Sequence, residues 1–281
     1  MRVKDIFVNP VNAPTARAFV KKWHYSHKVV NNSQVHYGAY YNNVLHGIMS
    51  FGPSMDKRKI QGLVKDTGWN EFVELNRMAF DDTLPKNSES RALSVALRLL
   101  KKSNPQLKWV ISFADATQCG DGTMYRAANF LLTGIKENNQ VWVAPNKEVF
   151  SRLSLTDGRS YGVQNRALTI ARMTMTKGKH INSDGKASMK KYIEAGFRPL
   201  KGYQLRYIYF YDKGDAEALV PSIIPYSTIV EVGASMYKGI KRGEHESNAS
   251  CFLQEESGVI PTTALQNSHE RELNGKKHQQ E

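Results

Sequence analysis

Four apolar residues near the N-terminus recur at the spacing of one helical face: Ala16, Phe19, Val20 and Trp23. The predicted helix begins after Asn12, whose side chain can cap the first turn, and Pro14 suits that turn because no N–H is needed there. We expect the helix to end near His24-Tyr25-Ser26. The pattern therefore predicts one amphipathic helix with a single buried face.

Two apolar runs, 35–41 and 44–51, then flank the dipeptide Asn42-Asn43. Because asparagine tolerates the positive φ that tight hairpin turns require, this pattern predicts a β-hairpin. The next segment, 52–70, is rich in Gly, Lys and Asp, and we expect it to be a loop.

Two strand-to-helix units are predicted next. In the first, a strand over 71–79 leads through a polar loop at 81–90 into a helix over about 90–102 with a broad apolar face. In the second, the strand Trp109–Asp115 leads through a Gly-rich turn into a helix over 125–134. A helix that follows a strand directly presents unpaired N–H groups and a positive dipole end, which together form an anion site.

The second half of the chain predicts a strand at 141–144, a short helix from Ser188 to Ala195 and an aromatic, alternating strand at 204–211. Residues 243–281 are polar with few large apolar side chains, and we expect a disordered tail there.

These elements predict an α+β fold with a mixed central sheet flanked by helices. We expect residues 1–150 to form the catalytic core and 151–242 to form a basic extension with a strand that completes or flanks the sheet.

The formal net charge of +13 favours a polyanionic partner such as nucleic acid. Positive charge accumulates over 152–201, and four tyrosines in or just after this run could stack on bases: Tyr161, Tyr192, Tyr203 and Tyr207. A solvated basic surface with core tyrosines is the alternative.

No run approaches the roughly 20 apolar residues of a membrane helix, and the N-terminus has no signal-peptide core, so we expect a cytoplasmic protein. Cys119 and Cys251 form neither a disulfide framework nor a zinc spacing.

The tandem strand-to-helix units resemble the core of GNAT N-acyltransferases. Several further segments resemble the phage Mom family of DNA adenine-modification proteins, over about residues 15–242 and in a similar order: His24-Tyr25, Glu74-Leu-Asn-Arg77, Pro85–Ser90, Ser112–Ala116, Tyr125-x-x-x-Asn-Phe130 with Gly134, Arg206–Phe210 and Met236–Gly239.

The Mom resemblance implies a phage-encoded transferase that converts adenine in double-stranded DNA to N6-carbamoylmethyladenine and thereby protects the phage DNA from host restriction enzymes. It implies an active site of His24, Tyr25 and Asp115, with bound iron suggested at these three residues. Arg77 and Ser112 are expected to lie beside them. The adenine must be extruded from the duplex to be reached. The oligomeric state stays open, and a dimer is compatible with the sequence.

The acyltransferase resemblance implies a phosphate-binding loop before the first of the two helices, where most relatives have glycines. Here the loop contains Lys86, Asn87, Ser88 and Ser90 and has no glycine, so close backbone approach to coenzyme A is hindered. These residues and Tyr125 are the candidate cofactor contacts. The donor is expected to be acetyl-CoA or a related acyl or glycine-derived compound.

Each candidate also has a purely structural interpretation. His24 and Tyr25 can cap a helix, Asp115 can turn the chain, Arg77 can pair with a nearby carboxylate, and Tyr125 can fill the core. Two other functions therefore stay open at this point. One is a conventional N-acyltransferase acting on a small amine, a tRNA or a protein, and the other is a basic DNA-binding protein without catalytic activity.

Overall fold

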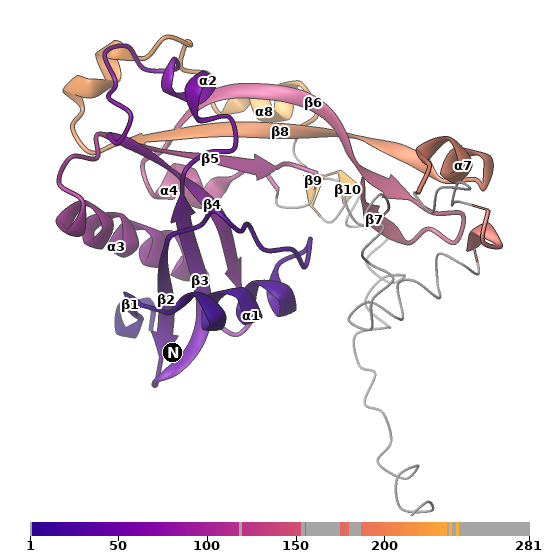
Figure 1. Cartoon of the computed structure of the whole chain (residues 1–281), viewed down its shortest axis with the longest axis horizontal. Helices are drawn as coiled ribbons and strands as arrows, with labels where there is room; N and C mark the ends of the chain where they lie inside the picture. The colour runs from indigo at the N-terminus through magenta and orange to yellow at the C-terminus, as the bar shows by residue number, and fades with distance from the viewer. Residues whose placement is uncertain are drawn as a thin grey trace, which may run out of the picture. The chain divides into compact units, whose positions relative to one another are not determined.

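The computed structural model describes residues 2–117, 120–152, 155, 175–179, 187–234, 236–237 and 240–241. Its centre is a mixed sheet of eight strands (Figure 1), which lie in the order β1 (Phe7–Pro10), β2 (Val35–Tyr41), β3 (Val44–Gly52), β4 (Phe72–Phe80), β5 (Trp109–Asp115), β8 (Arg198–Phe210), β6 (Leu131–Val143) and β7 (Val149–Ser151). Only β4 and β5 are parallel neighbours. The predicted α+β fold with a mixed central sheet flanked by helices is confirmed.

The helices of the described part are α1 (Ala13–Trp23), α2 (Lys57–Gln61), α3 (Ser88–Ser103), α4 (Thr123–Ala127), α7 (Met189–Glu194) and α8 (Ser227–Glu231). Short 3-10 helices lie at Val3–Asp5 and Gly214–Ala218, and a separate two-stranded sheet pairs β9 (Met236–Tyr237) with β10 (Ile240–Lys241). No helix in the described ranges is long and apolar enough to span a membrane.

The first helix and the hairpin form as their sequences predict. The Asn12 side chain accepts a hydrogen bond from the Thr15 N–H at 2.9 Å, which caps α1. Asn42 and Asn43 take φ values of 48° and 61° in the turn between β2 and β3. Both predictions are confirmed, because each depends on a local residue preference that the fold does not override.

The sheet has two differently covered faces. On the α3 face, Leu93, Leu97 and Leu100 pack with alternate residues of β5, including Val110 and Ala114. On the opposite α1 face, three α1 residues pack with Ile48 and Ala79, which lie on β3 and β4: Ala16, Phe19 and Val20. The remaining residues of β5, among them Trp109 and Ile111, also face this side, where they pack with Phe72 and Ile208.

A β-bulge at Asn76 decides which face Arg77 reaches. Ser50 of β3 pairs with Arg77, but the next residue, Phe51, pairs with Leu75, so Asn76 is an extra residue in β4. Leu75 packs in the α3-face core. In a regular strand Arg77 would share that face, and the bulge instead turns it to the α1 face together with Ala79.

The two parallel strands pair only over their first halves. Phe72–Leu75 of β4 pairs with Trp109–Ser112 of β5, and the pairing then stops. Beyond this point β4 stays with β3, whereas β5 stays with β8 as far as Asp115. The C-terminal ends of β4 and β5 therefore point the same way without pairing with each other.

The predicted helix over 125–134 is present only as far as Ala127 and is wrong beyond that residue. Helix α4 ends at Ala127, because Asn129 takes a left-handed conformation with φ 63° and the chain turns directly into β6. Strand β6 starts at Leu131 and pairs with β8 as far as Val143, so the predicted strand at 141–144 is its final part. Long-range pairing with β8, which no local pattern signals, outweighs the helical spacing of this segment.

Three smaller differences also appear. The expected loop at 52–70 contains the short helix α2, and the strand predicted at 204–211 begins earlier, at Arg198. This strand, β8, lies between β5 and β6 in the interior of the sheet. The tail predicted at 243–281 falls outside the described residues.

Candidate functional site

His24 ends α1 and is buried against the sheet. Its Nδ1 accepts a hydrogen bond from the Ser26 N–H at 3.1 Å and lies 2.8 Å from Ser26 Oγ. In the neutral ring the proton therefore sits on Nε2, which becomes a donor. Burial, followed by the positive charge of Arg77 and then His27, lowers the His24 pKa to about 3. His24 is thus neutral near pH 7 and donates from Nε2.

Tyr25 lies next to His24 with its ring stacked on the imidazole, the two centroids 4.4 Å apart. The side chain is partly open to solvent, with 44% of the residue exposed. A ring that is supported on one side by a buried neighbour can still meet a planar ligand on the other.

Arg77 joins β4 to the segment that follows α1. Its Nε donates to the Lys28 carbonyl at 3.1 Å, and Nη1 donates to the Asn76 carbonyl at 2.8 Å. Burial lowers the Arg77 pKa, while Tyr25 and Glu74 act in the opposite direction. Ser26 Oγ lies 2.8 Å from His24 Nδ1 and accepts from the Lys28 N–H at 3.4 Å, and Lys28 in turn accepts from Arg77. With Tyr25 stacked on His24, the three predicted residues therefore form one cluster on the α1 face.

Two residues near Arg77, Glu74 and His36, were not predicted as site residues from the sequence. Glu74 lies on the same face, and burial raises its pKa although the polar side chains of Ser54 and Asn76 oppose the change. His36 lies in a cross-strand row with Ser50 and Arg77. Its Nδ1 is 2.8 Å from Ser50 Oγ, and its buried Nε2 has no hydrogen-bond partner in the described part of the chain. Both could have been found only from the hairpin register and the bulge.

Asp115 lies at the end of β5. Alternation along this regular strand gives Asp115 the same face as Trp109 and Ile111, which is the α1 face that also carries Arg77. One carboxylate oxygen, Oδ1, accepts from the Thr117 N–H at 3.0 Å and so helps to turn the chain. The structural interpretation of Asp115 as a residue that turns the chain therefore applies to Oδ1.

Ser112 and Tyr125 lie on the opposite face. Ser112 Oγ donates to the Tyr125 hydroxyl at 2.9 Å, and Tyr125 stacks on Tyr207 with centroids 4.7 Å apart. Both residues are buried, within or beside the α3-face core. The sheet thus lies between the Ser112–Tyr125 pair and the cluster of His24, Tyr25 and Arg77.

The predicted cofactor loop leads into α3 beside a cavity of about 450 Å³. Asn87 takes a left-handed conformation with φ 70°, and the hydroxyls of Ser88 and Ser90 donate to the Pro85 and Asn87 carbonyls at 2.5 and 3.1 Å. Both hydroxyl protons are therefore committed within the chain. Lys86 also lines the cavity.

Three carboxylates line the same cavity, those of Asp81, Asp82 and Glu89. The Glu89 pKa is raised, chiefly by desolvation and then by the negative charge of Asp82. Asp81 is held by His46, whose Nδ1 lies 2.9 Å from its Oδ2. Three acidic groups beside one lysine repel a pyrophosphate, so the residues present do not fit coenzyme A.

Iron at His24, Tyr25 and Asp115 also fits poorly. Nδ1 of His24 already accepts a hydrogen bond, and Nε2 carries the proton, so binding a metal would require the loss of one of these features. Within the described residues, no three His, Cys, Asp or Glu side chains converge to hold a metal ion.

The basic run over 152–201 is described only in part. The described cations include Arg152, Lys190, Lys191, Arg198 and Lys201, whereas Tyr161 lies outside the described residues. The other tyrosines of that prediction are buried: Tyr192 packs near Trp142 and Phe197, and Tyr203 and Tyr207 pack in the α3-face core. These three are core residues rather than stacking platforms.

A family model described as the Mom protein family matches residues 5–228. A curated relative, methylcarbamoylase mom of Escherichia phage Mu, is 37% identical over 136 residues, which are 48% of this chain and 56% of the relative. The chain thus matches somewhat more than half the length of this relative.

Solved acetyltransferases are also similar. One from Bacillus subtilis, in complex with CoA, has a TM-score of 0.38 at 10% identity and covers 74% of this chain and 98% of its own. A GNAT family acetyltransferase from Elizabethkingia anophelis, with acetyl-CoA bound, has a TM-score of 0.37 at 18% identity and covers 52% of this chain and 93% of its own.

Proposed function

The chain belongs to the Mom protein family, and from this membership we propose that it modifies adenine in double-stranded DNA. The proposed product is N6-carbamoylmethyladenine, in keeping with the name methylcarbamoylase of the phage Mu relative. The modified base would protect phage DNA from host restriction enzymes in the host cytoplasm.

The cluster of His24, Tyr25 and Arg77 on the α1 face is the observation that carries this proposal. A partly exposed tyrosine ring, a neutral imidazole that donates from Nε2 and a fixed guanidinium form a surface for a flat, polar group. An extruded adenine has an aromatic face and hydrogen-bond acceptors along its edge, so its chemistry matches this surface.

The reaction requires a base, since the exocyclic amine of adenine is conjugated to its ring and is a poor nucleophile. His24 cannot serve while Nε2 holds the proton, so we assign the base to the Asp115 carboxylate. In the proposed step, N6 bonds to the methylene carbon of a carbamoylmethyl donor as the bond from that carbon to its leaving group breaks. The N6 proton passes to Asp115. Arg77 stabilises the negative charge that develops on the leaving group.

The donor must supply a methylene carbon together with a terminal amide. Transfer from acetyl-CoA would instead join N6 to a carbonyl and would add no amide nitrogen. A glycine-derived donor that is neutral or cationic also suits the carboxylates of Asp81, Asp82 and Glu89 better than coenzyme A does. A donor-binding role is proposed on this basis for Lys86, Asn87, Ser88 and Ser90, which line this cavity, whereas Tyr125, the fifth candidate, lies in the α3-face core.

Nucleoside mass analysis of DNA from cells that express the protein tests the proposal. We expect a carbamoylmethylated deoxyadenosine with the wild type, its loss with His24→Ala and its retention with His27→Ala, a control at the exposed neighbouring histidine. An N-acetylated adenine would indicate a conventional acyltransferase. Unmodified DNA that is nevertheless bound by the protein would indicate a non-catalytic DNA-binding protein.

The net charge of +13 supports double-stranded DNA as the partner. Binding should weaken steeply as salt rises, because each neutralised phosphate releases counterions. Fluorescence anisotropy with a duplex at low and physiological salt measures this dependence. An affinity that does not change with salt would contradict a phosphate-based interface.

A further inference from the structure

Met55 is the most exposed of the large apolar residues in the described part of the chain, with 94% of its surface open to solvent. An isolated exposed apolar side chain is common on protein surfaces. Met55 differs because the chain that presents it is held in place. The preceding residue, Ser54, is buried, and the Pro53 carbonyl accepts from the Asn32 side chain at 2.6 Å and from the Asn76 side chain at 3.5 Å.

The same contacts connect the segment that carries Met55 to the strand that carries Arg77. Asn76 is the bulge residue, and its carbonyl accepts from Arg77. The Ser54 side chain lies beside the Glu74 carboxyl, which also interacts electrostatically with Arg77. Met55 therefore projects from a short segment that is fastened to the strand carrying Arg77.

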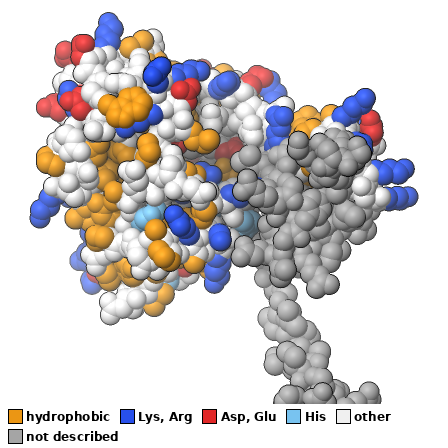
Figure 2. Space-filling model, viewed as in Figure 1, with side chains coloured by type: hydrophobic (Ala, Val, Ile, Leu, Met, Phe, Trp, Pro, Cys, Tyr) orange, Lys and Arg blue, Asp and Glu red, His pale blue; other side chains and the backbone are white. Residues whose placement is uncertain are grey.

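Cations follow Met55 closely in the chain, and one of them contacts an exposed aromatic ring. Helix α2 begins two residues later and carries Lys57, Arg58 and Lys59. The Lys57 amine lies 4.6 Å from the centroid of the Trp69 ring. About half of the surface of Trp69 is exposed to solvent. Figure 2 shows basic and hydrophobic side chains next to one another on the face where Figure 1 places α1 and α2. A polyanion with hydrophobic, stacked groups is the partner that fits this surface.

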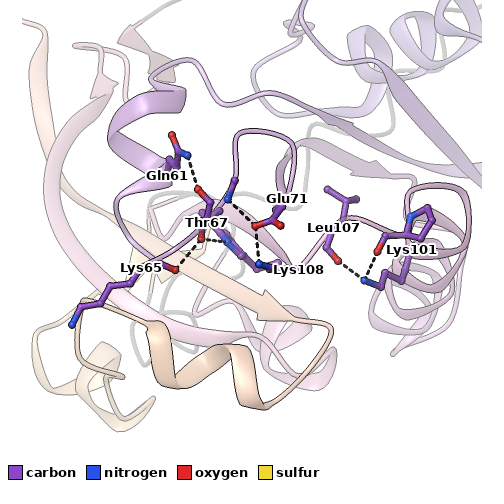
Figure 3. Close-up of polar contacts among 10 residues, drawn as sticks. Gln61, Lys65, Thr67, Glu71, Lys101, Leu107 and Lys108 are labelled. Atoms are coloured by element: carbon purple, nitrogen blue, oxygen red, sulfur yellow. Dashed lines mark hydrogen bonds and ion pairs between the residues drawn. The ribbon is translucent and has the colours of Figure 1, made fainter.

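The segment after α2 is anchored to the sheet (Figure 3). Gln61 Nε2 donates to the Thr67 carbonyl at 2.6 Å, and Trp109 Nε1 donates to Thr67 Oγ1 at 3.2 Å. Glu71 accepts from the Gly68 N–H at 2.7 Å and pairs with Lys108 at 2.9 Å. The surface formed by Met55, α2 and Trp69 is thus held at both ends. One set of contacts lies just after β3 ends and the other lies where β4 begins.

We propose that Met55 inserts into the base stack of duplex DNA and fills the space that the extruded adenine leaves, an inference that rests on the proposed function. Arg58 and Lys59 hold the backbone phosphates beside the insertion. Proteins that distort DNA commonly insert an apolar side chain such as methionine between base steps, and the inserted group offsets part of the cost of unstacking.

Two duplexes of the same sequence test this role. In one every base is paired, and in the other an adenine that the wild type modifies lies opposite an abasic site, so it is already easy to extrude. We expect Met55→Ala to lower affinity for the paired duplex about tenfold, which corresponds to roughly 1.4 kcal/mol. Affinity for the abasic duplex should change much less. Met55→Leu should behave like the wild type, because leucine can insert in the same way.

Val230→Ala is the matched control, since Val230 is also highly exposed but follows Ile229, which packs into the α3-face core. It should leave both affinities unchanged. If Met55→Ala lost affinity equally for both duplexes, or for neither, the insertion of Met55 into the base stack would be contradicted. If the wild type modifies no adenine, the abasic site is placed opposite any adenine. The ratio of the affinities for the paired and the abasic duplex still tests the role of Met55, so a failure of the proposed function is distinguished from a failure of this inference.

Discussion

Arg77 donates from Nε to the backbone carbonyl of Lys28, 3.1 Å away, and so links the middle of the sheet to the segment that carries His24 and Tyr25. Through Nη1 the same guanidinium also holds the Asn76 carbonyl at the bulge. With two donors fixed in different directions, the Arg77 side chain holds β4 and the segment after α1 in position relative to each other. The arrangement explains why charge alone would not replace this arginine.

Arg77→Lys should lose modification activity and lower the free energy of unfolding by about 1–2 kcal/mol, because lysine cannot reach both carbonyls. Denaturant unfolding and nucleoside analysis measure the two effects. Arg91→Lys is the control, since the exposed Arg91 side chain donates to the Lys4 carbonyl away from the site. Full activity in Arg77→Lys would show that only the positive charge matters.

His24 should make the protein less stable in acid. Its pKa is about 3 in the fold and near 6.5 in the unfolded chain, so between these values the unfolded state binds the additional proton. Stability from this residue is therefore complete above about pH 6.5 and is lost progressively as the pH falls towards 3. Denaturant unfolding of His24→Gln should give a flatter dependence over this window, whereas His27→Gln should follow the wild type. Parallel curves for all three proteins would contradict a buried, neutral His24.

Asp115→Asn should abolish modification while leaving folding and DNA binding nearly normal. The asparagine oxygen can still accept from the Thr117 N–H, so the turn is kept and only the base is lost. Asp121→Asn is the matched control, because Asp121 makes a similar contact with the Thr123 N–H. Thermal unfolding, duplex binding and nucleoside analysis of both variants separate a chemical role from a structural one. Retained modification in Asp115→Asn would remove this residue from the mechanism.

Ser112 and Tyr125 should behave as one structural unit. Ser112→Ala and Tyr125→Phe each remove their shared hydrogen bond, and each should cost about 1 kcal/mol of stability. The double variant should lose less than the sum of the two single losses, by about 0.5–1 kcal/mol. A double-mutant cycle in denaturant measures this coupling. Strictly additive losses would mean that the contact contributes nothing to stability.

The acidic cavity beside α3 should exclude coenzyme A. Replacing Asp82 by Asn and Glu89 by Gln removes two negative charges near the helix N-terminus and should raise affinity for coenzyme A, as measured by isothermal titration calorimetry. Glu217→Gln, on a 3-10 helix whose residues do not line the cavity, is the charge-matched control. Tight binding of coenzyme A to the wild type would contradict the assignment of this cavity to a different donor.

Local signals in the sequence predicted much of the fold. The asparagine cap of α1, the Asn-Asn hairpin and the apolar face of α3 each depend on nearby residues, and each formed as expected. The segment after α4 did not, because β6 exists through its pairing with β8, more than fifty residues away in the chain. Pairing between distant strands leaves no periodic mark that distinguishes it from a short helix.

Part of the site was also predictable. His24, Tyr25 and Arg77 meet as the family resemblance implies, although nothing in their spacing requires it. The separation of Ser112 from Asp115 follows from strict alternation along β5 once the strand is known. The neighbours Glu74 and His36 could not be predicted, because their position beside Arg77 depends on a hairpin register and on one unpaired residue.

That unpaired residue, Asn76, has a consequence for any comparison of β4 between relatives. The two halves of the strand are out of phase, so odd-numbered positions point one way before it and the opposite way after it. An alignment that treats the strand as regular would assign Arg77 to the α3-face core and Met78 to the α1 face. A graft of this strand into another scaffold would preserve the guanidinium's direction only if it carried the irregularity along.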